Sequence, residues 1–244
     1  MTLLAGAPSS WWMPANGAAH GAAFDHEMVL SLVIVGVLMI IAKAILVASA
    51  LSPARERAAE RPVNFFGLGT LIVLTVVFAW LLIRAERMRA QQRFTGADPT
   101  AMQVEVVGEQ FVWYFRYPGP DATFGTTRPE LVDAAAGNPL GLDRRDSRAA
   151  DDRVTSELVL PVNREVDVRL RALDVIHGFF IPGMRVKQNA LPGSTLHVHF
   201  TPDVIGVYPI VCSQVCGLGH YRMQAQLRVV NEADFEHWLT GRAK

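Results

Sequence analysis

The hydrophobic pattern of the chain changes near residue 94. Before that point two long apolar stretches dominate: Met28 to Leu51, in which Lys43 is the one charged residue, and Val63 to Ile83, which has none. A helix that rises ~1.5 Å per residue needs about 20 residues to cross ~30 Å of hydrocarbon. The pattern therefore predicts two transmembrane helices, at 28–51 and 63–83, which form a hairpin within residues 26–94.

The charged residues around the two stretches predict the orientation of the hairpin. The connecting segment Pro53–Pro62 carries three Arg, whereas residues 1–27 carry no Lys or Arg. Because cytoplasmic loops carry an excess of positive charge, we expect this connection in the cytoplasm, and the external segment 1–25 and the C-terminal domain outside. Neither stretch is typical of a signal peptide, because no Lys or Arg precedes the first and both are longer than the short apolar region of a cleaved signal. Four Arg after the second stretch oppose this orientation: Arg84, Arg87, Arg89 and Arg93.

After residue 94 the pattern becomes short alternating runs broken by Gly, Pro and Asp, which is typical of a small antiparallel β-domain. About seven strands favour a sandwich over residues 95–244. Residues 118–152 are rich in Pro, Gly, Asp and Ala and predict a surface insertion, and Glu232–Gly241 predicts a short amphipathic helix. The expected strands are Met102–Val107, Phe111–Tyr117, Leu158–Pro161, Glu165–Ala172, Thr195–Thr201, Gly206–Val211 and Gln224–Val230.

Charge and cysteine content narrow the choice of partners and cofactors. Residues 95–244 carry 15 Lys and Arg against 18 Asp and Glu, and this slight acidic excess favours a basic partner over nucleic acid. The chain has two cysteines, Cys212 and Cys216, which are too few for a disulfide framework. It has no Cys-x-x-Cys-His run, so we expect no c-type haem in this chain.

Four side chains with metal-binding atoms lie close together near the C-terminus. The segment CSQVCGLGHYRM places Cys212, Cys216, His220 and Met223 at steps of four, four and three residues. Two thiolates, an imidazole and a thioether favour copper, whereas structural zinc sites use Cys and His. A single-copper blue site needs one Cys and two His, so the second Cys favours two metal ions that share the thiolates. Such a site needs another imidazole, and the best candidate is His177, in a loop after a predicted strand.

Two segments, DVIHGFFIPGMRVKQNALPG and CSQVCGLGHYRM, resemble subunit II of the haem-copper cytochrome c oxidases. The resemblance spans nearly the whole chain, including the hairpin. It implies a cupredoxin-like, Greek-key β-sandwich with a dinuclear copper centre of the Cu-A type. The ligands that the resemblance implies are His177, Cys212, the backbone carbonyl of Gln214, Cys216, His220 and Met223.

Position 214 departs from the family pattern. Family members usually have a glutamate there, whose carboxylate helps bind a Mg or Mn ion at the interface with subunit I. Gln214 keeps the main-chain oxygen, so we expect the copper site to be intact, whereas the Mg or Mn site lacks this carboxylate and is doubtful. The motif QVCGLGH resembles the more divergent branches of the family.

The resemblance also implies partners and a location. A reduced cytochrome c would deliver electrons to the copper centre, which would relay them to haem in subunit I, where oxygen is reduced to water. The two helices would lie in the lipid bilayer of a bacterial-type cell membrane, with the copper domain on the external, periplasmic side. The family receives electrons at an aromatic run that usually begins with tryptophan. Here that position is Phe111, so Phe111 and Trp113 are the candidates for contact with the donor.

Several alternatives stay open from the residues alone. An electron-input subunit of a Cu-A nitric oxide reductase shares the hairpin and the copper loop, and a membrane-tethered copper-delivery protein is a third possibility. Lys43 is either a snorkelling or partner-facing lysine or a member of an ion path. We interpret His197 and His199 as part of a solvated strand face rather than as a metal pair. Arg185 and Lys187 are candidates for contact with negative groups of a partner subunit, such as haem propionates.

Overall fold

The structure is a computed structural model that describes residues 13–51, 65–93 and 96–241. The predicted cytoplasmic connection Pro53–Pro62 and residues 1–12 of the predicted external segment lie outside the described residues. Contacts divide the chain into two units. One is the helical unit 22–91, and the other is a β-domain that includes the residues on either side of the hairpin.

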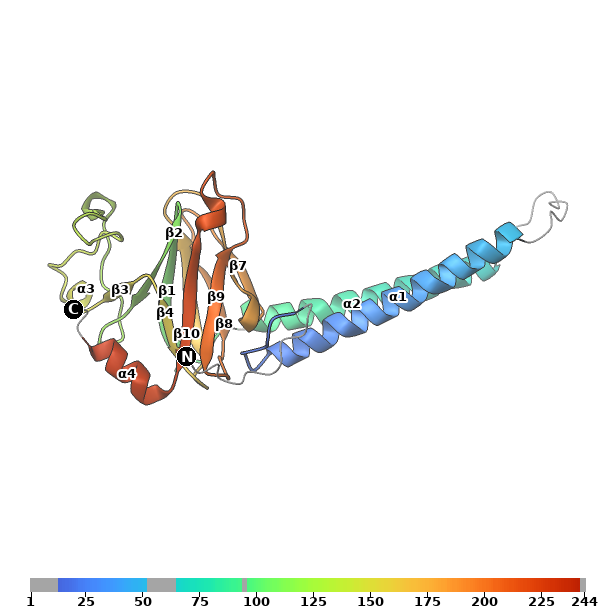
Figure 1. Ribbon diagram of the computed structural model, residues 1–244, viewed down its shortest axis with the longest axis horizontal. Helices are drawn as coiled ribbons and strands as arrows, with labels where there is room; N and C mark the ends of the chain where they lie inside the picture. Colours follow the sequence, from blue (N-terminus) through green and yellow to red (C-terminus); the bar gives the residue numbers. More distant parts are fainter. Residues whose placement is uncertain (1–12, 52–64, 94–95, 242–244) are drawn as a thin grey trace. The chain divides into compact units, whose positions relative to one another are not determined.

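Two long helices, α1 (Gly21–Leu51) and α2 (Phe65–Arg93), form the helical unit and run side by side (Figure 1). Both are long and apolar enough to cross a membrane, with mean hydropathies of 2.8 and 2.2 over their most apolar windows. α1 begins earlier and α2 ends later than the predicted helices. The residues that extend α2 are chiefly Arg, Glu and Gln, which favour helix but are not part of an apolar stretch.

An ion pair joins the start of α1 to the second half of α2. Arg84 Nη2 lies 2.6 Å from Glu27 Oε2, and Arg84 Nε lies 2.8 Å from the same oxygen. The Arg84 guanidinium also lies over the ring of Trp80, 5.1 Å from its centroid. Since the Glu27 carboxylate offsets the charge of Arg84, it weakens one of the four positive charges that oppose the predicted orientation.

The β-domain is a sandwich of two five-stranded sheets (Figure 1), which confirms the predicted fold class. The strand orders are β3-β2-β1-β5-β8 and β4-β10-β9-β6-β7. The strands are β1 Met102–Glu109, β2 Val112–Tyr117, β3 Arg153–Thr155, β4 Leu158–Pro161, β5 Val166–Ala172, β6 His177–Ile181, β7 Val186–Ala190, β8 Leu196–Phe200, β9 Gly206–Cys212 and β10 Gln224–Val230. The short helices are η1 Pro129–Leu131, α3 Ser147–Ala150, η2 Pro182–Met184, η3 His220–Arg222 and α4 Glu232–Thr240.

Three of these strands, β3, β6 and β7, were absent from the sequence prediction. β6 reads HGFFI and is almost wholly buried, so it has no alternation of apolar and polar residues. β7 has polar residues at its three central positions, and β3 is three residues long. Alternation detects half-buried strands of moderate length, and none of the three is of that kind. The error matters because β6 begins at His177, which the sequence placed in a loop.

Aromatic side chains join the two sheets and the C-terminal helix in the core. Trp113 and Phe179 meet edge to face with ring centroids 5.4 Å apart. The Tyr117 hydroxyl donates to the Val159 carbonyl at 3.0 Å and accepts from the Val159 N–H at 2.7 Å. Burial raises the pKa of Tyr117 well above its usual range, so the hydroxyl stays protonated. α4 packs Phe235 against this tyrosine, with ring centroids 6.5 Å apart.

A buried network of charges ties the insertion 118–152 to the first sheet. Arg116, on β2, donates from Nε to Asp152 at 2.8 Å and from Nη1 to Glu105 of β1 at 3.1 Å. It also donates to the Gly125 carbonyl, near the start of the insertion. The side chains of Arg116 and Asp152 are 2% and 0% exposed. Because a buried charge is tolerated when it is paired, the network fixes both ends of the insertion against the sheet.

The residues before α1 contact η2 and the residue that follows β8. Gly17 donates its N–H to the Gly183 carbonyl at 2.8 Å, and Ala19 donates to the Thr201 carbonyl at 3.0 Å. The guanidinium of Arg185 donates to Pro182 O at 2.7 Å and to Pro14 O at 2.9 Å. Contact of Arg185 with a partner's negative groups stays a prediction, and in this chain its Nη2 hydrogen bond to Pro14 connects the segment before α1 to the β-domain.

We expect Arg116→Met to lower the free energy of unfolding by about 3–5 kcal/mol, because it leaves the buried Asp152 carboxylate without its cationic partner and Glu105 with Arg171 alone. Arg145→Met is the matched control. Arg145 is 81% exposed and pairs with Asp143, so its loss changes stability by about 0–1 kcal/mol. Denaturant unfolding of the purified chain in detergent, followed by near-ultraviolet circular dichroism, measures both. Equal midpoints for the two variants would contradict a stabilising role of the network.

Candidate metal centre

The strand arrangement brings His177 next to the cysteine loop. β6 pairs with β9, so that Phe179 lies opposite Cys212, and Ser213 donates its N–H to the Gly178 carbonyl at 2.8 Å. The connection between β9 and β10 lies at one end of the sandwich (Figure 1). The first residue of β6 and the last residue of β9 therefore meet at this end, although they are far apart in the sequence.

The sulfur atoms and imidazoles form one compact group. Cys216 Sγ lies 3.8 Å from Cys212 Sγ, 3.8 Å from Met223 Sδ and 3.7 Å from His220 Nδ1. The ligand atoms of His177, Cys212 and Cys216 all lie within 4.8 Å of one another. Neither cysteine forms a disulfide. Because a metal ion contacts all its ligands at once, this convergence is the geometry that a metal centre requires.

His177 is oriented by a carboxylate. Its Nε2 lies 2.8 Å from Asp174 Oδ1, and its ring is fully buried. Its other ring nitrogen, Nδ1, is buried and has no hydrogen-bond partner among the described residues. A buried polar atom without a partner is costly. A metal ligand with its second nitrogen held by a carboxylate is a common arrangement for histidine, so this ring fits a bound metal.

Asp174 connects the histidine to the turn between β1 and β2. Its second oxygen accepts the Gln110 N–H at 2.8 Å, and the Gln110 side-chain amide donates to the Cys216 carbonyl. Burial raises the pKa of Asp174, but hydrogen bonds from His177, Val175 and Gln110 outweigh it and hold the pKa below its usual range. The carboxylate is therefore ionised at neutral pH and can hold the imidazole as an acceptor.

Glycines of β1 and of the connection between β9 and β10 lie where other groups come close. A Cβ atom on Gly108 would lie 2.9 Å from His177 Cδ2, so a side chain there would displace the imidazole. Gly217 has φ +143, a conformation that favours glycine. Its Cβ would lie 2.7 Å from Gln110 Nε2. Gln214 is exposed, and its carbonyl oxygen lies 3.1 Å from Cys212 Sγ.

The thiol of Cys216 is hard to ionise without a metal. Burial, together with the hydrogen bond and charge of the neighbouring Cys212, raises the pKa of Cys216 to about 11. At neutral pH this thiol is protonated, so metal binding has to displace its proton. Thiolates, thioether and imidazole are together a donor set that suits copper.

The two aromatic candidates for donor contact have different surroundings. Phe111 is 36% exposed, and its ring lies against Gly217 and Gly219 of the cysteine loop. Trp113 is 1% exposed and packs edge to face on His177, with centroids 5.8 Å apart. Trp113 therefore cannot touch a docked protein in this structure, and Phe111 remains as the candidate.

The alternating histidines of β8 lie outside the cluster. His197 Nδ1 is 2.9 Å from Asp167 Oδ2, and His199 Nδ1 is 2.7 Å from Glu165 Oε1. His197 is exposed, but His199 is partly buried, so the face is less solvated than the sequence suggested. Among the described residues, the group of three that could hold a metal consists of His177 and the two cysteines.

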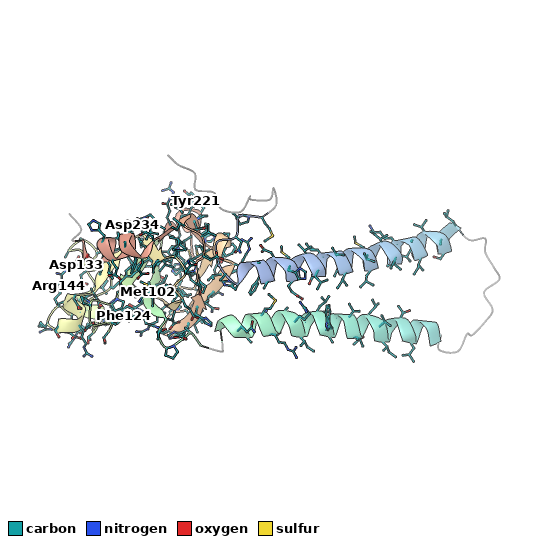
Figure 2. The ribbon with its side chains drawn as sticks, turned by 90° about the horizontal axis from the view of Figure 1, so that it is seen from below. Met102, Phe124, Asp133, Arg144, Tyr221 and Asp234 are labelled. Atoms are coloured by element: carbon teal, nitrogen blue, oxygen red, sulfur yellow. The ribbon has the colours of Figure 1, made fainter. Side chains whose placement is uncertain are left out.

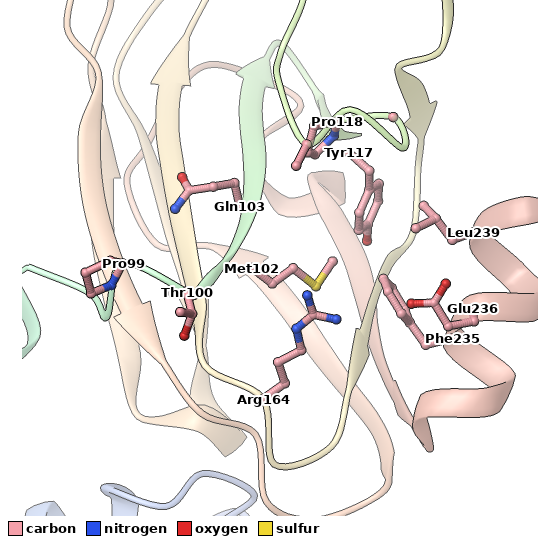
Figure 3. A pocket seen from close by; sticks show the side chains of 13 residues that line it. Pro99, Thr100, Met102, Gln103, Tyr117, Pro118, Arg164, Phe235, Glu236 and Leu239 are labelled. Carbon is pink, nitrogen blue, oxygen red and sulfur yellow. The ribbon is translucent and has the colours of Figure 1, made fainter.

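A cavity of about 340 Å³ lies elsewhere in the domain, between α4 and the start of β1 (Figure 3). Met102, Tyr117 and Phe235 line its apolar part, and Arg164 and Glu236 line its polar part. None of its lining residues is a Cys or a His. This cavity is thus separate from the metal-binding cluster.

Fold and cluster define a β-sandwich with a soft-ligand metal centre, and comparison with known proteins gives the family. Residues 102–230 match the family model described as "Cytochrome C oxidase subunit II, periplasmic domain". The alternative cytochrome c oxidase subunit 2 of Bradyrhizobium diazoefficiens is 36% identical over 149 residues, which are 60% of this chain and 53% of that protein. Cytochrome c oxidase subunit 2 of Cereibacter sphaeroides is 33% identical over 162 residues, 61% of this chain and 51% of that protein.

A solved structure, the periplasmic domain of subunit II of cytochrome oxidase of Bradyrhizobium japonicum, is 28% identical. It aligns with 58% of this chain and 93% of its own, with a TM-score of 0.43. The family match covers more than half of the chain, and the chain therefore belongs to the cytochrome c oxidase subunit II family. It spans about half the length of the two curated relatives described above.

Asp174→Ala should weaken copper binding about 10–100-fold, because the His177 ring loses the carboxylate that orients it. The matched control is Asp167→Ala, which removes the carboxylate partner of another histidine, His197, away from the cluster. Competition with a copper chelator, followed by the copper–thiolate absorption, measures the affinity. Equal affinities in the two variants would show that the Asp174 contact does not position the ligand.

Proposed function

We propose that this chain is the electron-input subunit of a membrane-bound terminal oxidase. It takes electrons from a cytochrome c and passes them to haem in the catalytic subunit I, where oxygen is reduced to water. The observation that carries the proposal is the buried cluster of His177 with Cys212 and Cys216 in a chain of the subunit II family. The two membrane-length helices support attachment to a bilayer, and the match to the periplasmic domain of the family supports a periplasmic location of the β-domain.

The ligand set proposed for the site is a dinuclear copper set. Two thiols 3.8 Å apart can share two metal ions as bridges, whereas one blue copper uses a single Cys. The remaining ligands are His177, His220, Met223 and the Gln214 carbonyl, all supported by their closeness to a cysteine sulfur. A copper pair bound there would supply a one-electron carrier.

The protein's own residues hold this set and exclude water. Cys212, Cys216 and Met223 are buried, and the fully buried Trp113 packs against the His177 ring. Ligands held by packed strands and hydrogen-bonded supports move little, which is what repeated electron transfer requires. The Phe111 ring lies against the cysteine loop and is partly exposed, which supports a donor contact at this position.

The test is the metal content and electron paramagnetic resonance spectrum of the purified complex. We expect two coppers per chain and a signal from one electron shared between them, because two thiolates bridge the ions. Cys216→Ser removes a bridge and should abolish the shared signal. Ser213→Ala is the control, since Ser213 Oγ is buried without a hydrogen-bond partner among the described residues. One copper with a localised signal would contradict the proposal and favour a copper-delivery role.

A further inference from the structure

Packing holds the cysteine loop on its inner side only. Cys216 and Met223 turn inward and are buried, whereas Leu218 is 98% exposed. Tyr221 is 67% exposed and projects at the surface of the domain (Figure 2). A segment that buries little of its apolar surface opens easily. The backbone of this loop therefore needs hydrogen bonds from outside the loop to keep its candidate ligands in place.

Gln110, in the turn between β1 and β2, makes such a hydrogen bond. Its side-chain Nε2 donates to the Cys216 carbonyl, and its backbone N–H donates to Asp174 Oδ2 at 2.8 Å. The other oxygen of Asp174 lies 2.8 Å from His177 Nε2. One residue is thus bonded to the cysteine loop directly and to the histidine through a single carboxylate.

Gln110 also connects the two sheets at the end of the sandwich where the candidate ligands lie. β1 and β2 belong to the first sheet, whereas β6 and β9, which carry His177 and Cys212, belong to the second. The ladder between β1 and β5 ends with the pair of Gly108 and Ala172. Beyond this pair, the side chain and the backbone of Gln110 bind the two ligand-carrying segments.

The space for the Gln110 amide depends on Gly217. A Cβ atom at position 217 would lie 2.7 Å from Gln110 Nε2, so a side chain there would displace the amide from the Cys216 carbonyl. The amide N–H places the positive end of its dipole beside a candidate ligand residue, which favours the state of a metal centre that holds one more electron. Hydrogen bonds around cysteine ligands adjust reduction potentials in this way.

We propose that Gln110 is a positioning residue that couples the histidine side and the cysteine side of the metal centre. It acts on His177 through Asp174 and on the cysteine loop through the Cys216 carbonyl. The inference rests on the proposed function, because it takes a copper pair as the occupant of the site. Without the amide, the cysteine loop loses its support, so copper is held less tightly and the reduction equilibrium shifts toward the oxidised state.

Gln110→Leu in the purified complex removes the amide and keeps the backbone N–H. We expect copper binding, measured by competition with a chelator, to weaken about ten-fold. A redox titration of the copper signal should show an equilibrium constant for reduction that is lower by about three-fold or more, because the amide dipole is lost. Gln103→Leu is the matched control. Gln103 lies near the start of β1 and lines the cavity in Figure 3, so both quantities should stay as in the wild type.

A double-variant cycle tests the coupling itself. In the Asp174→Ala background the histidine has already lost its support, so the Gln110 amide no longer holds the two sides together. We expect Gln110→Leu to weaken copper binding by less than about three-fold in this background, against about ten-fold in the wild-type background. Equal effects in the two backgrounds would overturn the coupling and leave Gln110 as a local contact of the loop.

Two further results count against the inference. One is a Gln110→Leu complex with the affinity and reduction equilibrium of the wild type. The other is a Gln103→Leu complex that changes as much as Gln110→Leu, which would show a general effect of glutamine loss on the domain. Both leave the proposed function standing. If the wild-type complex holds one copper with a localised signal, the proposed function fails, and the inference fails with it.

Discussion

The pairing of β6 with β9 is the contact on which the centre depends. It sets His177 against Cys212 and Cys216 at the end of the sandwich. The Asp174 carboxylate binds Nε2 of the His177 ring, whereas Nδ1 is buried and has no hydrogen-bond partner among the described residues. Candidate ligands from two segments that are far apart in the sequence are thus brought together by the fold. The rest of the domain supports this contact: the core under Trp113 and the buried Arg116 network keep both sheets in place.

The division between buried and exposed groups explains how the site can be both stable and reachable. The sulfur atoms lie inside, where packing holds them, while the backbone of the same loop turns Leu218 outward and supports the Phe111 ring. Only a loop with Gly217 and Gly219 allows the ring so close. The closeness of the exposed Phe111 ring to the cysteine loop therefore follows from these two glycines.

Much of the fold and of the ligand set could be predicted from the sequence, for physical reasons. The length of the two apolar stretches predicts the helices, and the alternation of apolar and polar residues predicts seven strands. The cysteine loop carries four candidate ligand side chains of three types at short spacing, which limits the choice of metal. β6 could not be found, because a strand buried on both faces does not alternate. The roles of Asp174 and Gln110 depend on contacts across the sheets, and an Asp three residues before a candidate ligand His was the one local signal. The burial of Trp113 likewise depends on its packing against His177 and Phe179, which the sequence alone does not reveal.

The central claim is that two copper ions share the thiolates of Cys212 and Cys216. The most direct measurement is copper X-ray absorption of the purified complex, which reports the neighbours of the metal. The account predicts a copper–copper scattering vector together with sulfur and imidazole nitrogen neighbours. Sulfur and nitrogen neighbours without any copper–copper vector would contradict it.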